Sequence, residues 1–351
     1  MNKTFLASLL GALTLASLPL QAQAQAAALP ALGADLSQTS VSGISSGGFM
    51  TAQLHTAFSG SFVGAGIIAA GPYYCAGSVP SVKFMQNAMT TCMVPLGAAN
   101  APNAAFVYKK AQQFAQEGKI DDVANLARQK VYIFSGSSDG VVKTSVVNQT
   151  EKYYQLAGVP AAQIKYVKNI NAGHSIVTDT AGDVSCSATE PPFINNCGFE
   201  QSHDILRHIY GNLQAPASSD NLSGRILKFN QAEFIQGSRS SMSQTAYAYV
   251  PKACETEACK VHIAIHGCLQ GAKQLGDRYY SGTGYNEMAD TNRMIVLYPQ
   301  AEITPAINPQ GCWDFWGYSD ADTRNPQFHT RNAPQMSAIM AMVRRLGEAR
   351  R

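Results

Sequence analysis

Short apolar runs alternate with amphipathic segments along most of the chain. Runs of mainly aliphatic or β-branched residues, bounded by Gly, Pro, Asn or Asp, are typical of buried strands. These runs are residues 39–42, 62–70, 131–134, 164–167, 226–229, 246–250, 261–265 and 294–298. Apolar residues recur at helical spacing in residues 49–58, 106–117, 145–157, 285–292 and 335–348. Strands that alternate with helices predict an α/β fold, with a mostly parallel central sheet flanked by helices.

Residues 1–24 have the pattern of a secretory signal peptide. Lys3 gives a positive start, residues 5–20 form a short apolar run, and small residues suited to cleavage near 24–26 follow. The run is too short for a membrane anchor, and no later stretch is apolar enough to span a bilayer. We therefore expect a secreted, extracellular protein with one domain over residues 25–351; the periplasm is the alternative location.

The charge of the chain argues against nucleic acid as a partner. Charged residues make up 14% of the sequence and the net charge is only +3, whereas about 25% charged residues is usual in soluble domains. No basic run is interleaved with aromatic residues, as nucleic-acid binding would require.

Eight cysteines in an exported chain predict disulfide bonds. Their local spacing suggests the pairs Cys75–Cys92, Cys186–Cys197 and Cys254–Cys259, which leaves Cys268–Cys312. No C-x-x-C pair or H-x-x-x-H cluster has the spacing of zinc ligands. We therefore expect neither a metal nor a cofactor.

A G-x-S-x-G pentad, residues 43–47, centres on Ser45. A short β-branched stretch precedes it and the predicted helix 49–58 follows. Strand, glycine-rich turn and helix form the context of a nucleophile elbow, in which a serine stands on a sharp turn. The glycines allow that turn, and the helix N-terminus favours developing negative charge. The alternative interpretation is an ordinary Gly/Ser turn in a βα unit.

A second pentad, residues 136–140, follows the predicted strand 131–134. No helix is expected directly after Ser138, and no acidic residue between Ser138 and His174 is well placed to assist it. We therefore interpret Asp139 as the acid of a triad that begins with Ser45, although an Asp-Gly pair is also a common turn. The order serine, acid, histidine is that of α/β-hydrolases.

His174 is the expected base of this triad, because it lies in a glycine-containing loop directly after the predicted strand 164–167. A histidine accepts the proton of the serine, and a carboxylate fixes the tautomer of the histidine. His203 and His208 also follow Asp139, but they belong to a helical stretch with surface character. A lone histidine with a purely structural role is the alternative interpretation for His174.

The predicted strand 261–265 runs into His266-Gly267-Cys268. A His-Gly segment after a strand resembles the oxyanion loop of hydrolases, where a backbone N–H points at the tetrahedral intermediate. In an ordinary α/β-hydrolase this segment and the units after it precede the nucleophile, whereas here they follow His174. The sequence therefore predicts a circularly permuted α/β-hydrolase fold, which adjacent surface termini make physically tolerable.

Five motifs in this order resemble those of the extracellular poly(3-hydroxybutyrate) depolymerases with a type 2, circularly permuted catalytic domain. They are residues 43–48, 136–140, 171–174, 266–268 and 311–318. The resemblance covers nearly all of the chain after the signal peptide. It implies Ser45 as nucleophile, Asp139 as acid and His174 as base.

The resemblance also implies an oxyanion hole made by the backbone N–H groups of Ser46 and Cys268. A Cys268–Cys312 bond would tie the oxyanion loop to the tryptophan segment. The substrate crevice of the family carries an aromatic residue from the segment that contains Trp313 and Trp316 here. Core packing is the alternative role for either tryptophan.

The expected activity is that of a serine esterase that hydrolyses poly(3-hydroxybutyrate), or related short-chain polyhydroxyalkanoates, through an acyl-enzyme. Many members carry a separate polymer-binding domain, and no Thr-rich or fibronectin-like segment is found in this sequence. We therefore expect amorphous polymer, oligomers or another polyester as substrate, and a monomeric enzyme. The alternatives are a secreted feruloyl or acetyl-xylan carboxylesterase, and a non-catalytic protein that binds surfaces through Trp313, Trp316, Tyr279 and Tyr280.

Overall fold

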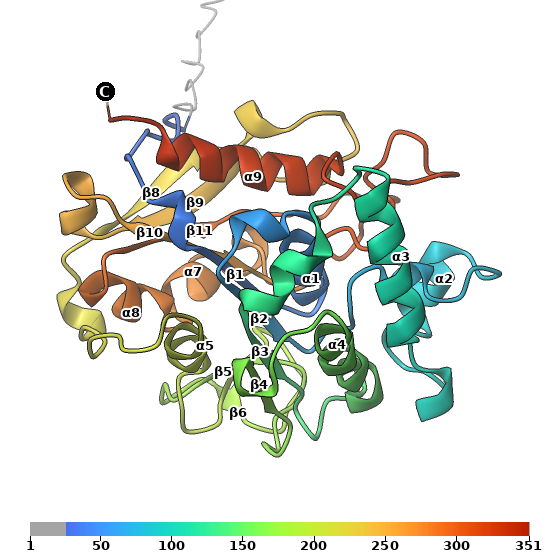
Figure 1. Ribbon diagram of the computed structural model, residues 1–351. Coiled ribbons are helices and arrows are strands. Elements are labelled where there is room, and N and C mark those ends of the chain that lie inside the picture. The colour runs from blue at the N-terminus through green and yellow to red at the C-terminus, as the bar shows by residue number, and fades with distance from the viewer. Residues whose placement is uncertain (1–25, 351) are drawn as a thin grey trace, which may run out of the picture.

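A central sheet of eight strands organises the computed structural model, which describes residues 26–350 (Figure 1). The expected signal peptide lies outside the described residues. The strand order is β4-β3-β2-β1-β10-β11-β9-β8, and only the pairs β11–β9 and β9–β8 are antiparallel. The strands are β1 (Thr39–Ile44), β2 (Gly64–Ile68), β3 (Lys130–Phe134), β4 (Ile164–Val167), β8 (Arg225–Asn230), β9 (Thr245–Val250), β10 (Lys260–Ile265) and β11 (Met294–Tyr298).

Helices cover both faces of this sheet (Figure 1). One apolar cluster joins the sheet to α1, α3, α4 and α9, and a second joins its other face to α5, α7 and α8. The α/β fold with a mostly parallel sheet is therefore confirmed. The helices are α1 (Ser46–Ala57), α2 (Phe84–Met89), α3 (Ala104–Gln116), α4 (Thr144–Leu156), α5 (Gln201–Tyr210), α6 (Ala272–Leu275), α7 (Arg278–Ser281), α8 (Tyr285–Thr291) and α9 (Pro334–Gly347).

Helix α1 is buried along its whole length, whereas the sequence suggested one apolar face. One side of α1 packs on β1 and β2. The segment after Cys312 covers another side, where Phe315 stacks on Phe49 with ring centroids 4.1 Å apart. A helix enclosed on all sides needs no amphipathic stripe, and the polar residues Gln53 and His55 of α1 are buried as well.

A second, three-stranded sheet follows His174 and was not expected from the sequence. It consists of β5 (Ile176–Thr178), β6 (Val184–Ser185) and β7 (Ile194–Asn196), in the order β5-β7-β6. Strands of two or three residues are too short to produce a recognisable alternation of polar and apolar positions.

The two halves of the central sheet come from different parts of the chain. Strands β1 to β4 build one half, and β8 to β11 build the other, with β10 next to β1. The start and end of the described chain also meet: Leu32 and Ala34 donate backbone hydrogen bonds to Leu346, and Gly33 donates one to Glu348. Adjacent ends are what a circular permutation requires, and the permutation itself stays a prediction from the order of the motifs.

Four disulfides join Cys75 to Cys92, Cys186 to Cys197, Cys254 to Cys259, and Cys268 to Cys312. The cysteine spacing in the sequence predicts the same pairs. Within residues 26–350, no helix combines the length and hydropathy that crossing a bilayer requires.

Candidate active site

Ser45 stands on a strained turn between β1 and α1. Its φ is 57° and its ψ is −124°, and α1 begins at the next residue. A positive φ is costly for a residue with a side chain and persists only where the surroundings enforce it. The turn leaves Ser45 partly exposed, although its neighbours on both sides are buried. Residues 43–47 therefore have the strand, sharp turn and helix of a nucleophile elbow, the geometry that the sequence predicts.

Close backbone packing explains the glycines of this turn. A Cβ on Gly43 would lie 2.5 Å from the carbonyl oxygen of Gly47, and one on Gly48 would lie 2.7 Å from that of Ile68. A Cβ on Gly47 would overlap the carbonyl oxygens of Ile265 and His266. The glycines therefore let β1, α1 and the end of β10 approach closely enough to force the serine out of the sheet.

Asp139 and His174 form a buried pair. Nδ1 of His174 donates to Oδ2 of Asp139 at 2.8 Å, and both side chains are at least nine-tenths buried. The other carboxylate oxygen of Asp139 accepts the backbone N–H groups of Val141 and Val142 at 2.8 and 2.9 Å. These bonds stabilise the charged carboxylate, and the pair leaves Nε2 of His174 free for a proton transfer.

Ser45, Asp139 and His174 follow the carboxyl ends of three parallel strands, β1, β3 and β4. Parallel strands present these ends at one edge of the sheet, where α/β folds place their sites. The connecting backbone is also joined across this edge: the N–H of Ser45 bonds to Ile68, and the N–H of Ser138 bonds to Ala172. The structure thus brings the predicted triad residues to the same edge.

The His266–Cys268 segment lies against the serine turn. A Cβ on Gly267 would lie 3.3 Å from the Cβ of Ser45. The first N–H groups of α1, Ser46 included, have no partner within the helix. The segment that carries the N–H of Cys268 thus lies beside the turn that carries the N–H of Ser46, and an oxyanion hole made by these two groups stays a prediction.

The two tryptophans occupy different environments. Trp313 is completely buried and packs against His266, with ring centroids 5.4 Å apart. Trp316 is partly exposed and borders a groove of about 900 Å³. Of the two, the structure therefore favours Trp316 for contact with a substrate. The docking face suggested as a non-catalytic alternative is not formed, because Trp313 and Tyr279 are both buried.

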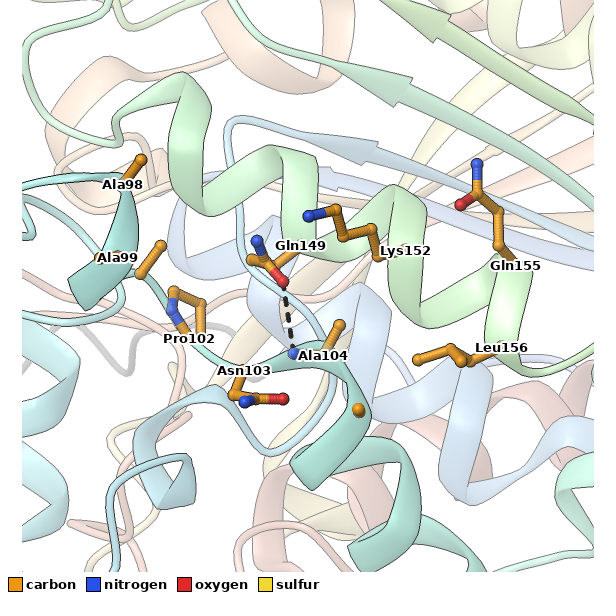
Figure 2. Close-up of a pocket in the computed structure, with 11 residues that line it drawn as sticks. Ala98, Ala99, Pro102, Asn103, Ala104, Gln149, Lys152, Gln155 and Leu156 are labelled. Carbon is orange, nitrogen blue, oxygen red and sulfur yellow. Dashed lines mark hydrogen bonds between the residues drawn. The ribbon is translucent and has the colours of Figure 1, made fainter.

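The groove beside Trp316 combines aromatic and basic side chains. The aromatic residues are Tyr74, Phe84, Phe106, Trp316 and Tyr318, and the basic ones are Lys83, Lys110, Arg239 and Arg324. A different pocket, of about 550 Å³, lies between the start of α3 and α4 (Figure 2). It is lined mainly by alanine and amide side chains, and none of the predicted triad residues lines either this pocket or the groove beside Trp316.

The rejected alternatives have structural roles. The exposed side chain of Ser138 donates a hydrogen bond to Asn171, in the loop that carries His174. His203 and His208 both lie on α5, where their Nε2 atoms bond to the carbonyl oxygens of Gly284 and Gln163. Among the described residues, no group of three or more His, Cys, Asp or Glu side chains is arranged to hold a metal ion.

Asp314 and Gln270 were not anticipated from the sequence. The buried carboxylate of Asp314 accepts the N–H groups of Trp316, Gly317, Tyr318 and Ser319, and so fixes the tryptophan segment. Gln270 accepts the N–H of Gly267 and holds the oxyanion loop. Both act on backbone groups close to them in the sequence, and single polar residues inside loops carry no periodic or motif signal.

No protein-family model matches the sequence. The chain is 44% identical to the poly(3-hydroxybutyrate) depolymerase of Delftia acidovorans over 323 residues, which is 91% of this chain and 61% of that protein. It is 38% identical to the polyhydroxybutyrate depolymerase of Talaromyces funiculosus over 343 residues, which is 93% of this chain and 94% of that protein. It thus spans less than two thirds of the first relative and nearly all of the second.

Two solved structures show the same architecture. The crystal structure of PHB depolymerase from Penicillium funiculosum matches with a TM-score of 0.80 and 36% identity, over 91% of this chain and 98% of that one. A serine-to-alanine variant of PHB depolymerase in complex with an R3HB trimer matches with a TM-score of 0.78 and 35% identity, over the same shares. The sequence and the fold together place this chain in the poly(3-hydroxybutyrate) depolymerase family.

Proposed function

We propose that this protein hydrolyses the ester bonds of poly(3-hydroxybutyrate) and related short-chain polyhydroxyalkanoates. The observation that carries the proposal is the 2.8 Å contact between His174 and Asp139 at the sheet edge that also presents the strained Ser45. Membership of the depolymerase family, and the R3HB trimer bound to a relative of the same fold, support the substrate class.

The mechanism follows from the three residue types. Oγ of Ser45 attacks the ester carbonyl carbon while Nε2 of His174 takes the hydroxyl proton, and Asp139 stabilises the imidazolium through Nδ1. The carbonyl oxygen becomes an oxyanion that the N–H groups of Ser46 and Cys268 stabilise. The C–O bond of the ester then breaks, and His174 returns the proton to the departing hydroxyl end of the polymer.

The second half of the reaction releases the acid. His174 takes a proton from water, the resulting hydroxide attacks the acyl-Ser45 ester, and the same N–H groups stabilise the second oxyanion. Breaking the acyl–Oγ bond frees a 3-hydroxy acid or its oligomer, and the proton returns to Ser45.

The groove beside Trp316 suits an aliphatic polyester chain. Its aromatic side chains offer apolar contact area to methyl and methylene groups. Polyester carbonyls carry no charge, so the chain can lie against these rings without a large desolvation cost.

We further propose that the protein works outside the cytoplasm, as a monomer. Four disulfides form and persist in oxidising compartments. One chain supplies the triad residues, both oxyanion donors and the tryptophan segment, so a second copy is not needed to complete the site.

The test is the clearing of an amorphous poly(3-hydroxybutyrate) suspension by the mature protein, beside Ser45→Ala. We expect the wild type to clear the suspension, and the variant to be folded but slower by about 10⁶-fold. Clearing by a folded Ser45→Ala protein would refute the nucleophile. Hydrolysis of feruloyl or acetyl-xylan esters without clearing would keep the triad and refute the substrate.

A further inference from the structure

His266 is a fully buried histidine with both ring nitrogens in use. The backbone N–H of Ala301 donates to Nε2 at 3.1 Å. Because an N–H can donate only to an unprotonated nitrogen, the ring proton of neutral His266 must lie on Nδ1. From there it is donated to the carbonyl oxygen of Gly267 at 2.7 Å.

This second hydrogen bond controls the direction of another group. The carbonyl of Gly267 and the N–H of Cys268 belong to the same peptide unit, which is planar and trans, so they point in opposite directions. Holding the oxygen toward His266 therefore turns the N–H of Cys268 away from His266. Gly267 also lies against Ser45, with its Cβ position 3.3 Å from the Cβ of the serine.

Gln270 holds the preceding peptide unit. Its Oε1 accepts the N–H of Gly267 at 2.7 Å, and its Nε2 donates to the carbonyl oxygens of Pro192 and Phe193 at 3.1 and 3.0 Å. Every polar atom of this buried amide is thus engaged. The loop is fixed on one side by β10 and on the other by the segment that leads into β7.

We propose that His266 and Gln270 are positioning residues for catalysis, which fix the Gly267–Cys268 peptide so that the Cys268 N–H faces the developing oxyanion. The proposal rests on the ester hydrolysis proposed above. Neither side chain touches the reacting atoms, and both act through the backbone of the loop. A donor fixed before the reaction stabilises the oxyanion without reorganising at the moment of attack.

Burial lowers the pKa of His266 to about 4. The ring is therefore neutral at the pH where an esterase triad works, and the donor and acceptor pattern described above is kept. A cationic ring would carry a proton on both nitrogens and would lose its bond with Ala301.

The decisive experiment separates the two hydrogen bonds of His266. In His266→Asn, the side-chain amide nitrogen falls near the position of Nδ1 and can still donate to Gly267. In His266→Gln, the side-chain amide lies near the position of Nε2, where its oxygen can accept the N–H of Ala301, but the donor to Gly267 is lost. We expect kcat to fall about tenfold or less in His266→Asn and about 100-fold in His266→Gln, since small misplacements in a site cost about this much.

Gln270→Met tests the second set of hydrogen bonds that holds this loop, because it keeps the side-chain length and removes both polar atoms. We expect its kcat on a soluble ester to fall tenfold or more, with KM unchanged. The inhibition constant of a trifluoromethyl ketone, whose tetrahedral adduct carries an oxyanion, should rise in proportion to the loss in kcat. His55→Gln is the matched control: it alters a buried histidine of α1, bonded to Tyr154, and should leave kcat unchanged.

Each rate is divided by the number of sites labelled at completion by a fluorophosphonate, so that misfolded protein does not count. Equal kcat values for His266→Asn and His266→Gln, together with an unchanged kcat in Gln270→Met, would overturn the proposal. So would a change confined to KM. A wild type that hydrolyses no ester would instead refute the proposed function.

Discussion

The two sides of the candidate oxyanion hole are held in different ways. On the Ser46 side, the backbone of β1, α1 and β10 packs so closely that glycine is required, and the contacts are steric. On the Cys268 side, the loop is held by its own polar side chains, His266 and Gln270, which also bond to distant segments, and by the disulfide to Cys312. The steric contacts admit only glycine and therefore leave a motif in the sequence, whereas the distant partners of His266 and Gln270 leave none.

The largest effect is expected at the serine turn. Gly47→Ala places a Cβ against the carbonyl oxygens of Ile265 and His266, which the sheet holds in place. We expect a loss of at least about 5 kcal/mol in the free energy of unfolding, and therefore little folded protein. The last glycine of the second pentad gives the control, because a Cβ on Gly140 meets nothing within 4 Å. Chemical denaturation measures both, and a well-folded Gly47→Ala would refute the steric account.

The next effect is expected at the disulfide that anchors the oxyanion loop. Replacing Cys268 and Cys312 by serine opens a link between residues 44 apart. The loss of loop-closure entropy predicts about 4 kcal/mol of destabilisation, and we expect kcat to fall as well because the loop loses an anchor.

The control for this prediction is the double serine variant of Cys254 and Cys259, which are only 5 residues apart. Its expected loss is about 2 kcal/mol with kcat unchanged. Thermal unfolding measures the loss of stability in both variants, and ester kinetics measure their kcat. Equal kcat values in the two variants would contradict a role for Cys312 in anchoring the loop.

The smallest effect is expected from the pH dependence of stability at Glu200. Glu200, before α5, accepts the N–H of Asp179 at 3.3 Å, just after β5. Burial raises its pKa to about 8, with smaller contributions from Asp179 and Glu287. The folded state therefore binds this proton more tightly than the unfolded chain, and stability is lost as the pH rises through about 8.

Because Glu200 is only partly buried, solvent screening should keep this loss below about 1 kcal/mol. We expect the melting temperature to drop by no more than about 2–4 °C between pH 6 and pH 9. Glu200→Gln, which keeps an acceptor for Asp179, should remove that drop. A melting temperature that changes with pH equally in wild type and variant would assign the effect to other groups.

Much of the fold could be predicted from the sequence. Uniform apolar runs gave the central strands to within a few residues, because strands buried on both faces allow little else. The turns at Ser45 and Asp139 were recognisable because glycine, serine and aspartate follow strands in a fixed local pattern.

Other features of the fold and the site could not be predicted from sequence patterns. The small sheet of β5 to β7 has strands too short for periodicity, and the helices α2, α6 and α7 are also short. The difference between Trp313 and Trp316 depends on which side of the segment faces α1, and that is set by the bonds that Asp314 accepts. The role of Gln270 depends on residues 192–193, far away in the chain.

The hydrogen bonds between residues 32–34 and 346–348 have a consequence for how fast this fold can be reached. A short peptide would suffice to close the chain into a ring there, and the ring could be reopened in the mostly exposed loop 211–224, ahead of β8. The rearranged chain would keep every contact of the sheet. The pairing of β1 with β10, whose partners now lie 222 residues apart at Ser40 and His262, would span a shorter loop. Contacts across the opened loop, such as that of His203 with Gly284, would span a longer one. Since non-local contacts slow folding, the folding rate of the rearranged protein would show which of these contacts limits the native chain.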